Sequence, residues 1–262
     1  MEGKKVALIT GASSGIGAGS ALQLAKDGFD LIISARRKEK LEEVAKQCRA
    51  EGAEVLVVPA DCSKEEDVKN IFAEAKKKFG KIDFYFCNQG VIHPPKYFEE
   101  LTLDDYYLVS EGNFKSVFLC LVNAINFMKE QPAGNILVTG SSSGIRPEAG
   151  VGVYSASKHA VIGLVKDAAI ECGRFNIRIN CLCPGGVDTP MVNGGADIDW
   201  DNLPADFRDH SDAHIRRYTI PLIPKRVVAK VSEITGMVSF MASEQSTFMC
   251  GSVISIDGGI TQ

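Results

Sequence analysis

Short apolar segments alternate with longer amphipathic ones along almost the whole chain, and this alternation constrains the fold more than any other feature. Residues 6–10, Val-Ala-Leu-Ile-Thr, form a short apolar run, whereas residues 38–50 carry apolar side chains at helical spacing among charged ones. Uninterrupted apolar strands are typical of a parallel sheet that helices cover on both faces. The alternation therefore predicts an α/β fold with a doubly wound parallel sheet of about seven strands.

The expected elements follow one another without a break for most of the chain. Strands are expected at residues 6–10, 30–34, 54–58, 82–87, 135–139, 177–182 and 252–256. Helices are expected after Gly15 and at residues 38–50, 64–78, 103–130, 153–172 and 229–242. No repeat or linker divides the series, so we predict a single domain over residues 1–262.

One segment, residues 191–218, interrupts the alternation. It holds six Asp, three Arg, Pro204 and the only Trp of the chain. We interpret this segment as an insertion that lies over a substrate as a lid. The alternative interpretation is a solvated surface loop.

Composition excludes several classes of protein. The formal net charge of -4 and the scattered basic residues do not fit a nucleic-acid partner. Apolar runs are interrupted by Gly, Ser or charged residues, and no charged-then-apolar leader opens the chain, so we expect neither a membrane span nor secretion. The eight cysteines are dispersed, which is typical of reduced thiols in the cytoplasm. Cys181 and Cys183 share one strand face without a second pair, so we predict no metal.

The turn after the first predicted strand is rich in glycine. Gly-Ala-Ser-Ser-Gly-Ile-Gly, residues 11–17, follows that strand and opens a predicted helix. Glycines let the backbone approach a pyrophosphate closely, and the helix N-terminus attracts its charge. The turn predicts a Rossmann-like dinucleotide site, although its spacing is not Gly-x-Gly-x-x-Gly and any strand-to-helix turn favours glycine. The residues assigned to this site are Gly11, Ser13, Ser14, Gly15, Ile16 and Gly17.

Two arginines follow the second predicted strand. Folds selective for NAD place an acid near this position, where it binds the ribose 2′-hydroxyl. Arg36 and Arg37 stand there instead, and a guanidinium pairs with a 2′-phosphate through charge-assisted hydrogen bonds. We therefore predict NADP(H) as the cofactor. The alternative is a solvated pair at the start of a helix.

Four residues carry the candidate proton chemistry. Tyr154 and Lys158 lie one turn apart on the same face of a predicted helix. An ammonium beside a phenol stabilises the phenolate, so the pair can pass a proton to or from an alcohol oxygen. Ser141, at a predicted strand end, can hydrogen-bond that oxygen or be only part of a serine-rich turn. Asn113, in the long predicted helix, can order water towards Lys158 or be an ordinary polar residue.

In this combination, the residues resemble the classical short-chain dehydrogenase/reductase family over almost the whole chain, from residue 6 to residue 260. The glycine turn matches the cofactor motif of that family. Asn113, Ser141, Tyr154 and Lys158 match its catalytic tetrad in order and spacing. Residues 184–189 and 256–259 match two further signatures towards the C-terminus.

The resemblance implies further cofactor contacts. It places Asp61 against the adenine, and Val187 and Thr189 against the carboxamide and the phosphates. It also places Tyr154 and Lys158 against the nicotinamide ribose and ring.

One turn departs from the family pattern, which is Asn-Asn-Ala-Gly. The chain reads Cys87-Asn88-Gln89-Gly90 at this point. Asn88 and Gly90 keep the core of the turn and are assigned to the cofactor site. Cys87 and Gln89 put its packing in doubt.

The resemblance implies an enzyme that transfers a hydride between the nicotinamide and an alcohol or carbonyl carbon. We expect a small-molecule secondary alcohol or ketone as substrate, with a hydroxysteroid or bile acid ranked first. Bulky side chains around the interruption are candidates for its pocket: Met191, Val192, Trp200 and Phe207. The alternatives are a sugar or polyol, a 3-oxoacyl thioester, or a non-catalytic dinucleotide-binding module. The resemblance also implies a homotetramer that associates through the helices at 103–130 and 153–172.

Overall fold

The computed structural model describes residues 3–192 and 222–262. Its strands form one parallel sheet, and their order is β3-β2-β1-β4-β5-β6-β7. The strands are β1 (Val6–Thr10), β2 (Asp30–Ala35), β3 (Val55–Pro59), β4 (Phe84–Cys87), β5 (Gly134–Thr139), β6 (Ile177–Pro184) and β7 (Val253–Ile256). The predicted α/β class and doubly wound sheet are thereby confirmed. The predicted lid at 191–218 lies outside the described residues except for Met191 and Val192.

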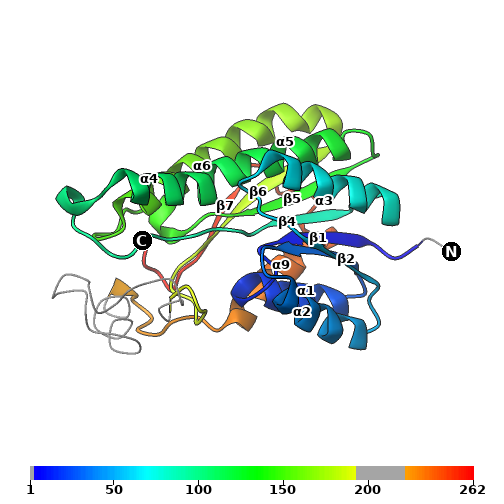
Figure 1. The fold of residues 1–262 in the computed structure, drawn as a ribbon, viewed down its shortest axis with the longest axis horizontal. Coiled ribbons are helices and arrows are strands. Elements are labelled where there is room, and N and C mark those ends of the chain that lie inside the picture. Colours follow the sequence, from blue (N-terminus) through cyan, green and yellow to red (C-terminus); the bar gives the residue numbers. More distant parts are fainter. Residues whose placement is uncertain (1–2, 193–221) are drawn as a thin grey trace.

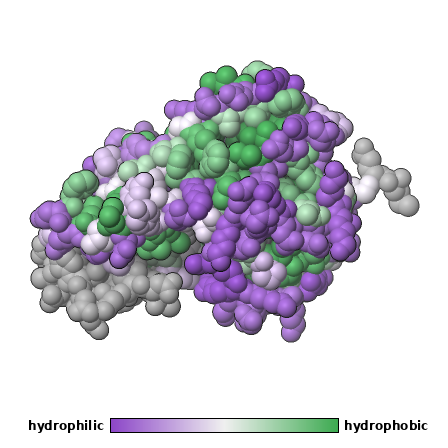
Figure 2. Space-filling view, turned by 45° about the horizontal axis from the view of Figure 1, so that its top comes forward, coloured by the Kyte–Doolittle hydropathy of each residue, from purple (hydrophilic) through white to green (hydrophobic). Residues whose placement is uncertain are grey.

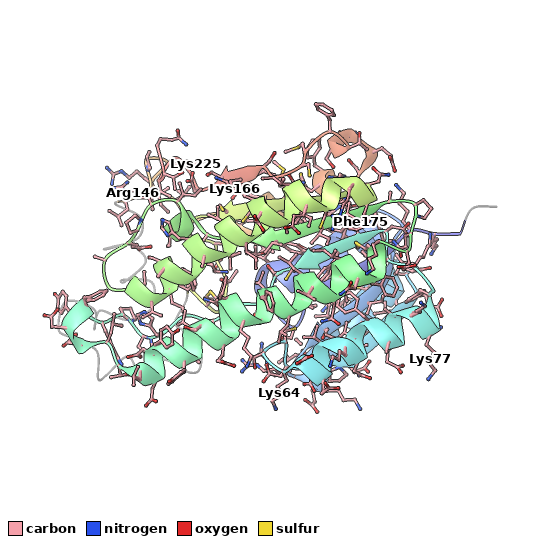
Figure 3. All side chains as sticks on the ribbon, turned by 90° about the horizontal axis from the view of Figure 1, so that it is seen from above. Lys64, Lys77, Arg146, Lys166, Phe175 and Lys225 are labelled. Atoms are coloured by element: carbon pink, nitrogen blue, oxygen red, sulfur yellow. The ribbon has the colours of Figure 1, made fainter. Side chains whose placement is uncertain are left out.

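Helices cover both faces of the sheet (Figure 1). On one face lie α1 (Gly15–Lys26), α2 (Lys38–Ala50) and α9 (Val231–Ala242). On the other face lie α3 (Glu65–Lys78), α4 (Leu103–Val109), α5 (Ser116–Met128) and α6 (Gly152–Cys172). Seen from above, α6, α5 and α3 run side by side over the sheet (Figure 3). Each face has its own hydrophobic core, which explains why the strands are apolar throughout rather than alternating.

The strand order reverses direction at β1, which pairs with β2 on one side and β4 on the other. Thr10 at the end of β1 is aligned with Ser34 on β2 and with Cys87 on β4. The chain leaves β1 and β4 to opposite sides of the sheet, so their carboxyl ends border an open crevice. In sheets of this type a ligand binds at that point.

The long helix predicted at 103–130 is divided by a π-helical segment, Ser110–Lys115. The Ser116 hydroxyl donates to the Gly112 carbonyl at 2.7 Å. A Cβ on Gly112 would lie 2.4 Å from a methyl carbon of Val91, so the segment presses against the chain that follows β4. Segments of this kind occur mainly at functional sites. Asn113 lies in the middle of it.

The run Leu103–Met128, which includes this segment, is also long and apolar enough to cross a membrane by length and composition alone. Our expectation that no segment has this character does not hold for it. Its buried side chains, which include Val117, Leu121 and Met128, pack in the core of the α3–α6 face. Packing on the sheet accounts for their apolar character in this structure.

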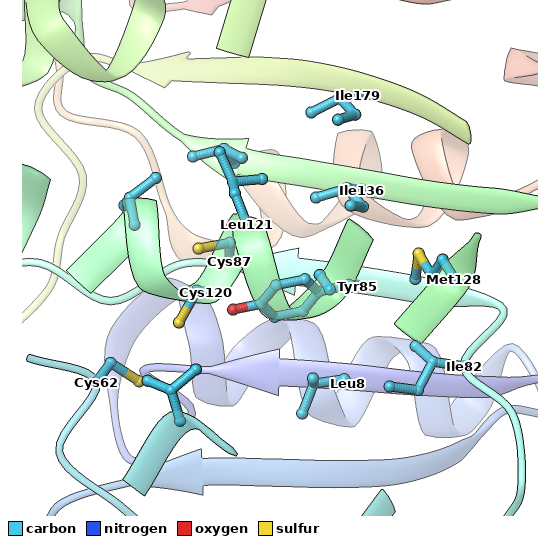
Figure 4. Close-up of a cluster of buried hydrophobic side chains, with 14 of the residues drawn as sticks. Leu8, Cys62, Ile82, Tyr85, Cys87, Cys120, Leu121, Met128, Ile136 and Ile179 are labelled. Atoms are coloured by element: carbon cyan, nitrogen blue, oxygen red, sulfur yellow. The ribbon is translucent and has the colours of Figure 1, made fainter. Parts of the chain in front are cut away.

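The cysteines are free thiols, and seven of the eight are buried. Cys62, Cys87 and Cys120 lie near the hydroxyl of Tyr85 in the core of the α3–α6 face (Figure 4). Burial raises the pKa of the Cys87 thiol well above its ordinary value. Cys181 and Cys183 bring their sulfur atoms to 3.8 Å on β6. Within residues 3–192 and 222–262, no group of three or more potential ligand side chains is arranged to hold a metal.

Candidate active site

A cleft of about 630 Å³ opens at the carboxyl ends of the central strands. The glycine turn after β1 and the two arginines after β2 line one part of it. Ser141, Tyr154 and Lys158 line another part, and Met191 and Val192 border it at the edge of the described residues. The structure thus brings the predicted cofactor residues except Gly17, and three of the four predicted tetrad residues, to one cleft.

The glycines of the first turn are required by its shape. Gly11 and Gly15 have φ values of +67° and +55°, in the left-handed region that favours glycine. A Cβ on Gly17 would lie 2.2 Å from the Gly11 carbonyl oxygen and 2.7 Å from Nδ2 of Asn88. The first turn of α1 contains no acidic side chain, and its N-cap residue, Ser14, makes no capping hydrogen bond. The N–H groups of this helix end are therefore available to an anion, so these residues fit a dinucleotide phosphate.

Basic side chains meet this turn from β2. Nη2 of Arg37 donates to the hydroxyl oxygens of Ser13 and Ser14, each at 3.2 Å. Arg36 and Arg37 both line the cleft. A phosphate placed here would meet a guanidinium and two hydroxyl groups at once.

Asp61 lies after β3 on the same side of the cleft. Burial alone would raise the pKa of its carboxyl, but two hydrogen bonds from Ser63 and the charges of Arg36 and Lys64 hold it below its ordinary value. The Ser63 hydroxyl donates to Oδ1 at 2.8 Å and its N–H donates at 3.0 Å. The carboxylate is thus ionised and fixed in orientation, as an acceptor for an amino group would need to be.

The turn that departs from the family pattern keeps its contacts with the sheet. Cys87 remains paired with Thr10 on β1 and Val138 on β5. The Thr10 hydroxyl donates to Oε1 of Gln89, and Nε2 of Gln89 lies 3.4 Å from the hydroxyl of Ser116. The larger side chain therefore links β1 to the start of α5 by hydrogen bonds. Cys87 and Gln89 therefore leave the pairing of β4 with its neighbours intact.

Asn88 and Gly90 lie between the predicted tetrad and the glycine turn. The Thr139 hydroxyl donates to Oδ1 of Asn88 at 3.0 Å. A Cβ on Gly90 would be 3.2 Å from Oδ1 of Asn113 and 3.4 Å from Nζ of Lys158. Both polar groups therefore lie beside the same face of Gly90, where a larger side chain would crowd them.

Asn113 is fully buried and its amide holds the backbone of Val91. Oδ1 accepts from the Val91 N–H at 2.7 Å, and Nδ2 donates to the Val91 carbonyl at 2.9 Å. Nδ2 also donates to the hydroxyl of Ser157 at 3.0 Å. The sequence placed Asn113 in the site, but Val91 and Ser157, its partners, carried no recognisable signal. The predicted water chain to Lys158 stays a prediction.

Tyr154 and Lys158 lie on one face of α6, as predicted. Nζ of Lys158 is 5.7 Å from the centre of the Tyr154 ring and donates to the Thr139 carbonyl at 3.0 Å. Both side chains are buried, with exposed fractions of 9% and 2% for Tyr154 and Lys158. Thr139 was not among the predicted site residues, because a threonine at the end of a strand has no distinctive sequence signal.

Ser141 lies two residues beyond the end of β5, in the same cleft as Tyr154 and Lys158. Its hydroxyl oxygen accepts from the Ser143 N–H at 3.1 Å, so its own hydrogen is free to be donated. Ser141 and Tyr154 both line the cleft, although no hydrogen bond joins them among the described residues.

Val187 and Thr189 lie in the chain that follows β6, and Thr189 packs against the glycine turn. The Thr189 hydroxyl donates to the Val187 carbonyl at 3.2 Å. A Cβ on Gly15 would lie 3.2 Å from the methyl carbon of Thr189. Both residues line the cleft, and their contacts with the carboxamide and the phosphates stay a prediction.

Comparison with known proteins decides the family. A family model described as short chain dehydrogenase matches residues 5–197. The chain belongs to this family. It is therefore an oxidoreductase of alcohols or ketones whose fold binds a nicotinamide dinucleotide.

Three relatives of this short-chain dehydrogenase cover nearly its whole length. Levodione reductase of Leifsonia aquatica is 34% identical over 258 residues, which are 97% of this chain and 93% of that protein. The 3beta-hydroxysteroid dehydrogenase of Mediterraneibacter gnavus is 33% identical over 266 residues, 98% and 95% of the two chains. Glucose 1-dehydrogenase of Gluconobacter oxydans is 34% identical over 261 residues, which are 99% of this chain and 92% of that protein. Small-molecule substrates of different classes thus occur among similar proteins.

Solved structures are similar over the same length. The crystal structure of levodione reductase has a TM-score of 0.89 at 32% identity and covers 98% of this chain and 97% of its own. A 3-ketoacyl-(acyl-carrier-protein) reductase from Brucella melitensis complexed with NADH has a TM-score of 0.86 at 30% identity, covering 98% of each chain. A variant of actinorhodin polyketide ketoreductase with NADPH has a TM-score of 0.90 at 26% identity. The match covers 99% of this chain and 98% of that chain. Both forms of the cofactor therefore occur in similar folds.

The shape of the glycine turn gives a first test. In Gly17→Ala the added methyl would meet the Gly11 carbonyl at 2.2 Å. Overpacking of this kind shifts the backbone, and the shift would displace the N–H groups at the start of α1, so we expect dinucleotide binding to weaken by about 10-fold or more, measured by quenching of protein fluorescence. Gly236→Ala in α9 is the control, since nothing lies within 4 Å of its Cβ position. Unchanged binding in Gly17→Ala would mean that the turn does not hold the dinucleotide.

Proposed function

We propose that this protein is an NADP(H)-dependent oxidoreductase that interconverts a secondary alcohol and a ketone, with Asn113, Ser141, Tyr154 and Lys158 as its catalytic tetrad. The observation that carries the proposal is the convergence of Ser141, Tyr154 and Lys158 on the cleft that the glycine turn borders. In this proposal residues 1–262 act as one dinucleotide-binding and catalytic domain, with 191–218 as a lid over the substrate.

The roles of the residues follow from their hydrogen bonds. In the direction of reduction, Tyr154 donates its phenolic proton to the carbonyl oxygen, and Ser141 donates a hydrogen bond to the same oxygen. Lys158 uses one of its three donors on Thr139, so the others remain for the cofactor ribose and its charge stabilises the phenolate. Asn113 holds Val91 in place beside them. The nicotinamide, when bound, supplies or accepts the hydride.

The tyrosine can be tested by removing one oxygen atom. Proton transfer by a positioned side chain contributes about 10²–10⁴-fold to a rate. The kcat of Tyr154→Phe should therefore be lower than that of the wild-type protein by about 10²-fold or more. Its affinity for NADPH should remain within about 2-fold, because the ring and its packing are kept. The measurement is absorbance at 340 nm with ketones and alcohols that span steroids, sugars and small diketones.

Tyr107→Phe is the matched control, since Tyr107 also lines the cleft but lies on α4. Its kcat should stay close to that of the wild-type protein. Retained turnover in Tyr154→Phe would remove this residue from the mechanism. Tight NADPH binding without turnover of any substrate by the wild-type protein would favour a non-catalytic dinucleotide-binding module.

The preference for NADP(H) rests on Arg36 and Arg37. Both line the cleft beside the glycine turn, and no acid occupies the position that binds a 2′-hydroxyl. A hydrogen bond to a charged group contributes about 1.5–3 kcal/mol, so Arg36→Ala should weaken NADPH binding by about 10- to 100-fold. NADH binding should change little. Arg49→Ala, at the far end of α2, should alter neither affinity.

Titration of each variant with both cofactors checks this prediction. Equal losses for NADPH and NADH would show that Arg36 does not read the 2′-phosphate. Retained preference in Arg36→Ala and lost preference in Arg37→Ala would transfer that role to the second arginine.

A hydroxysteroid or bile acid is the substrate that we propose first. Bulky apolar side chains border the cleft next to the tetrad, among them Leu108, Met191 and Val192. One of the relatives is named a 3beta-hydroxysteroid dehydrogenase. Sugars or polyols and 3-oxoacyl thioesters are the competing classes, and the same 340 nm assay separates them.

We also propose a cytoplasmic homotetramer. The eight free cysteines support a reducing compartment. Phe114, Phe118 and Val122 are exposed along the π-helical segment and α5, and Ile170 is exposed on α6. Figure 2 shows apolar residues gathered on this upper face. A contiguous apolar patch of this kind is typical of an interface.

Light scattering after size exclusion measures the assembly directly. We expect a molar mass four times that of the 28.2 kDa chain. Phe118→Glu should shift the mass to a smaller species, because it buries a charge in the proposed interface. Phe248→Glu changes another exposed phenylalanine, one that belongs to neither α5 nor α6. A monomeric wild-type protein would exclude the tetramer.

A further inference from the structure

One polar side chain between the glycine turn and the tetrad has no part in the proposed reaction. Gln89 lies in the turn after β4, where the family pattern has an alanine. A Cβ on Gly11 would lie 2.9 Å from both Cα and N of Gln89, so the backbone of Gln89 rests directly on the glycine turn. An alanine would make the same backbone contact. The amide group of Gln89 is therefore not needed for the shape of the turn.

The polar atoms of this amide are all engaged within the protein. Oε1 accepts a hydrogen bond from the Thr10 hydroxyl. Nε2 lies 3.4 Å from the hydroxyl oxygen of Ser116, and 3.4 and 3.5 Å from the sulfur atoms of Cys87 and Cys120. An amide nitrogen carries two hydrogens, and a hydroxyl oxygen is a better acceptor than a thiol sulfur, so one hydrogen goes to Ser116. Gln89 lines the cleft, but its amide is directed at other side chains and not at a ligand.

Ser116 passes this contact on to the π-helical segment. The side chain is buried, and its oxygen accepts from Gln89 while its hydrogen is donated to the Gly112 carbonyl at 2.7 Å. The same oxygen lies 3.3 Å from the carbonyl of Asn113. A serine that bonds to a carbonyl one turn earlier alters the local course of a helix. Ser116 therefore holds the backbone of the turn that carries Asn113.

The contacts continue from this turn to α6. Nδ2 of Asn113 donates to the Ser157 hydroxyl at 3.0 Å, and that hydroxyl donates to the Tyr154 carbonyl at 2.7 Å. A continuous series of contacts thus joins the glycine turn to the helix of the catalytic tyrosine, through Gln89, Ser116, Asn113 and Ser157.

We propose that Gln89 is a positioning residue, which acts through Ser116 to fix Asn113 relative to the bound dinucleotide. This inference rests on the proposed function and adds a residue to it. Hydride transfer needs one geometry, and a misplacement of about 1 Å can cost about 100-fold in rate. The side chain affects the rate and not the affinity for the cofactor, because the contact of Gln89 with Gly11 is made by the backbone.

The test removes the two ends of one hydrogen bond, separately and together. Gln89→Met keeps the length of the side chain without an amide, and Ser116→Ala removes the hydroxyl. Each should lower kcat by about 3- to 10-fold, as expected for one neutral hydrogen bond, and leave the Kd for NADPH within about 2-fold. The double variant should lose no more than the more affected single variant, because the two residues act as a unit.

The ketone for these assays is the one that the wild-type protein reduces fastest at 340 nm, and kcat is expressed per bound NADPH. Gln23→Met on α1 and Asn123→Ala on α5 are the matched controls, since each removes a hydrogen bond of a side chain that does not line the cleft. Both controls should keep the kcat of the wild-type protein. If Gln89→Met does not fold, Gln89→Ala takes its place, since the family pattern has alanine there.

Two outcomes would make Gln89 and Ser116 ordinary structural residues and overturn the proposal. One is a double variant whose loss of kcat is the product of the two single losses. The other is a loss of NADPH affinity that matches the loss of kcat.

The positioning role and the proposed function fail in different ways. If the wild-type protein reduces a ketone, Tyr154→Phe abolishes this activity, and the Gln89 and Ser116 variants keep the full kcat, then only the positioning role is overturned. A wild-type protein that binds NADPH but reduces no ketone overturns the proposed function, and the positioning role with it.

Discussion

The close packing of the start of α1 against the turns that follow β1 and β4 is the constraint on which the rest of the site depends. Gly17 lies against the Gly11 carbonyl and the Asn88 amide so closely that no Cβ fits between them. This approach brings the N-terminus of α1 to the crevice at β1 and β4. Any side chain larger than hydrogen would push α1 away from the turn after β4. The position of a bound phosphate relative to Asn88 and Gly90 is therefore determined by backbone packing.

A buried polar network extends from that contact to the tetrad. Thr139 connects the two, because its hydroxyl donates to Asn88 and its carbonyl accepts from Lys158. A buried ammonium is costly unless polar groups surround it. For Lys158 the described residues supply the Thr139 carbonyl and the face of the Tyr154 ring. The remaining donors face the cleft, where a ribose and a phenolate would satisfy them.

The sequence predicted the sheet and the cleft well because both depend on local patterns. Apolar strands, the glycine turn and the one-turn spacing of Tyr154 and Lys158 follow from rules that need no tertiary information. The π-helical segment could not be predicted from the sequence, since the apolar spacing around Asn113 is also that of a regular helix. Contacts that join distant segments could not be predicted either. Thr139 and Gln89 acquire their roles only when β1, β4 and β5 are side by side.

The π-helical segment also limits how the sequence of this region can change in length. A regular helix turns by about 100° for each residue, and the wider turn at Ser110–Lys115 accommodates one residue more than a regular turn would. Deleting a single residue there would restore a regular helix and rotate α4 relative to α5 by about that angle. Tyr107 and Leu108, which line the cleft from α4, would turn away from it. Changes in the length of this stretch should therefore disrupt the cleft, even where substitutions on its outer face are tolerated.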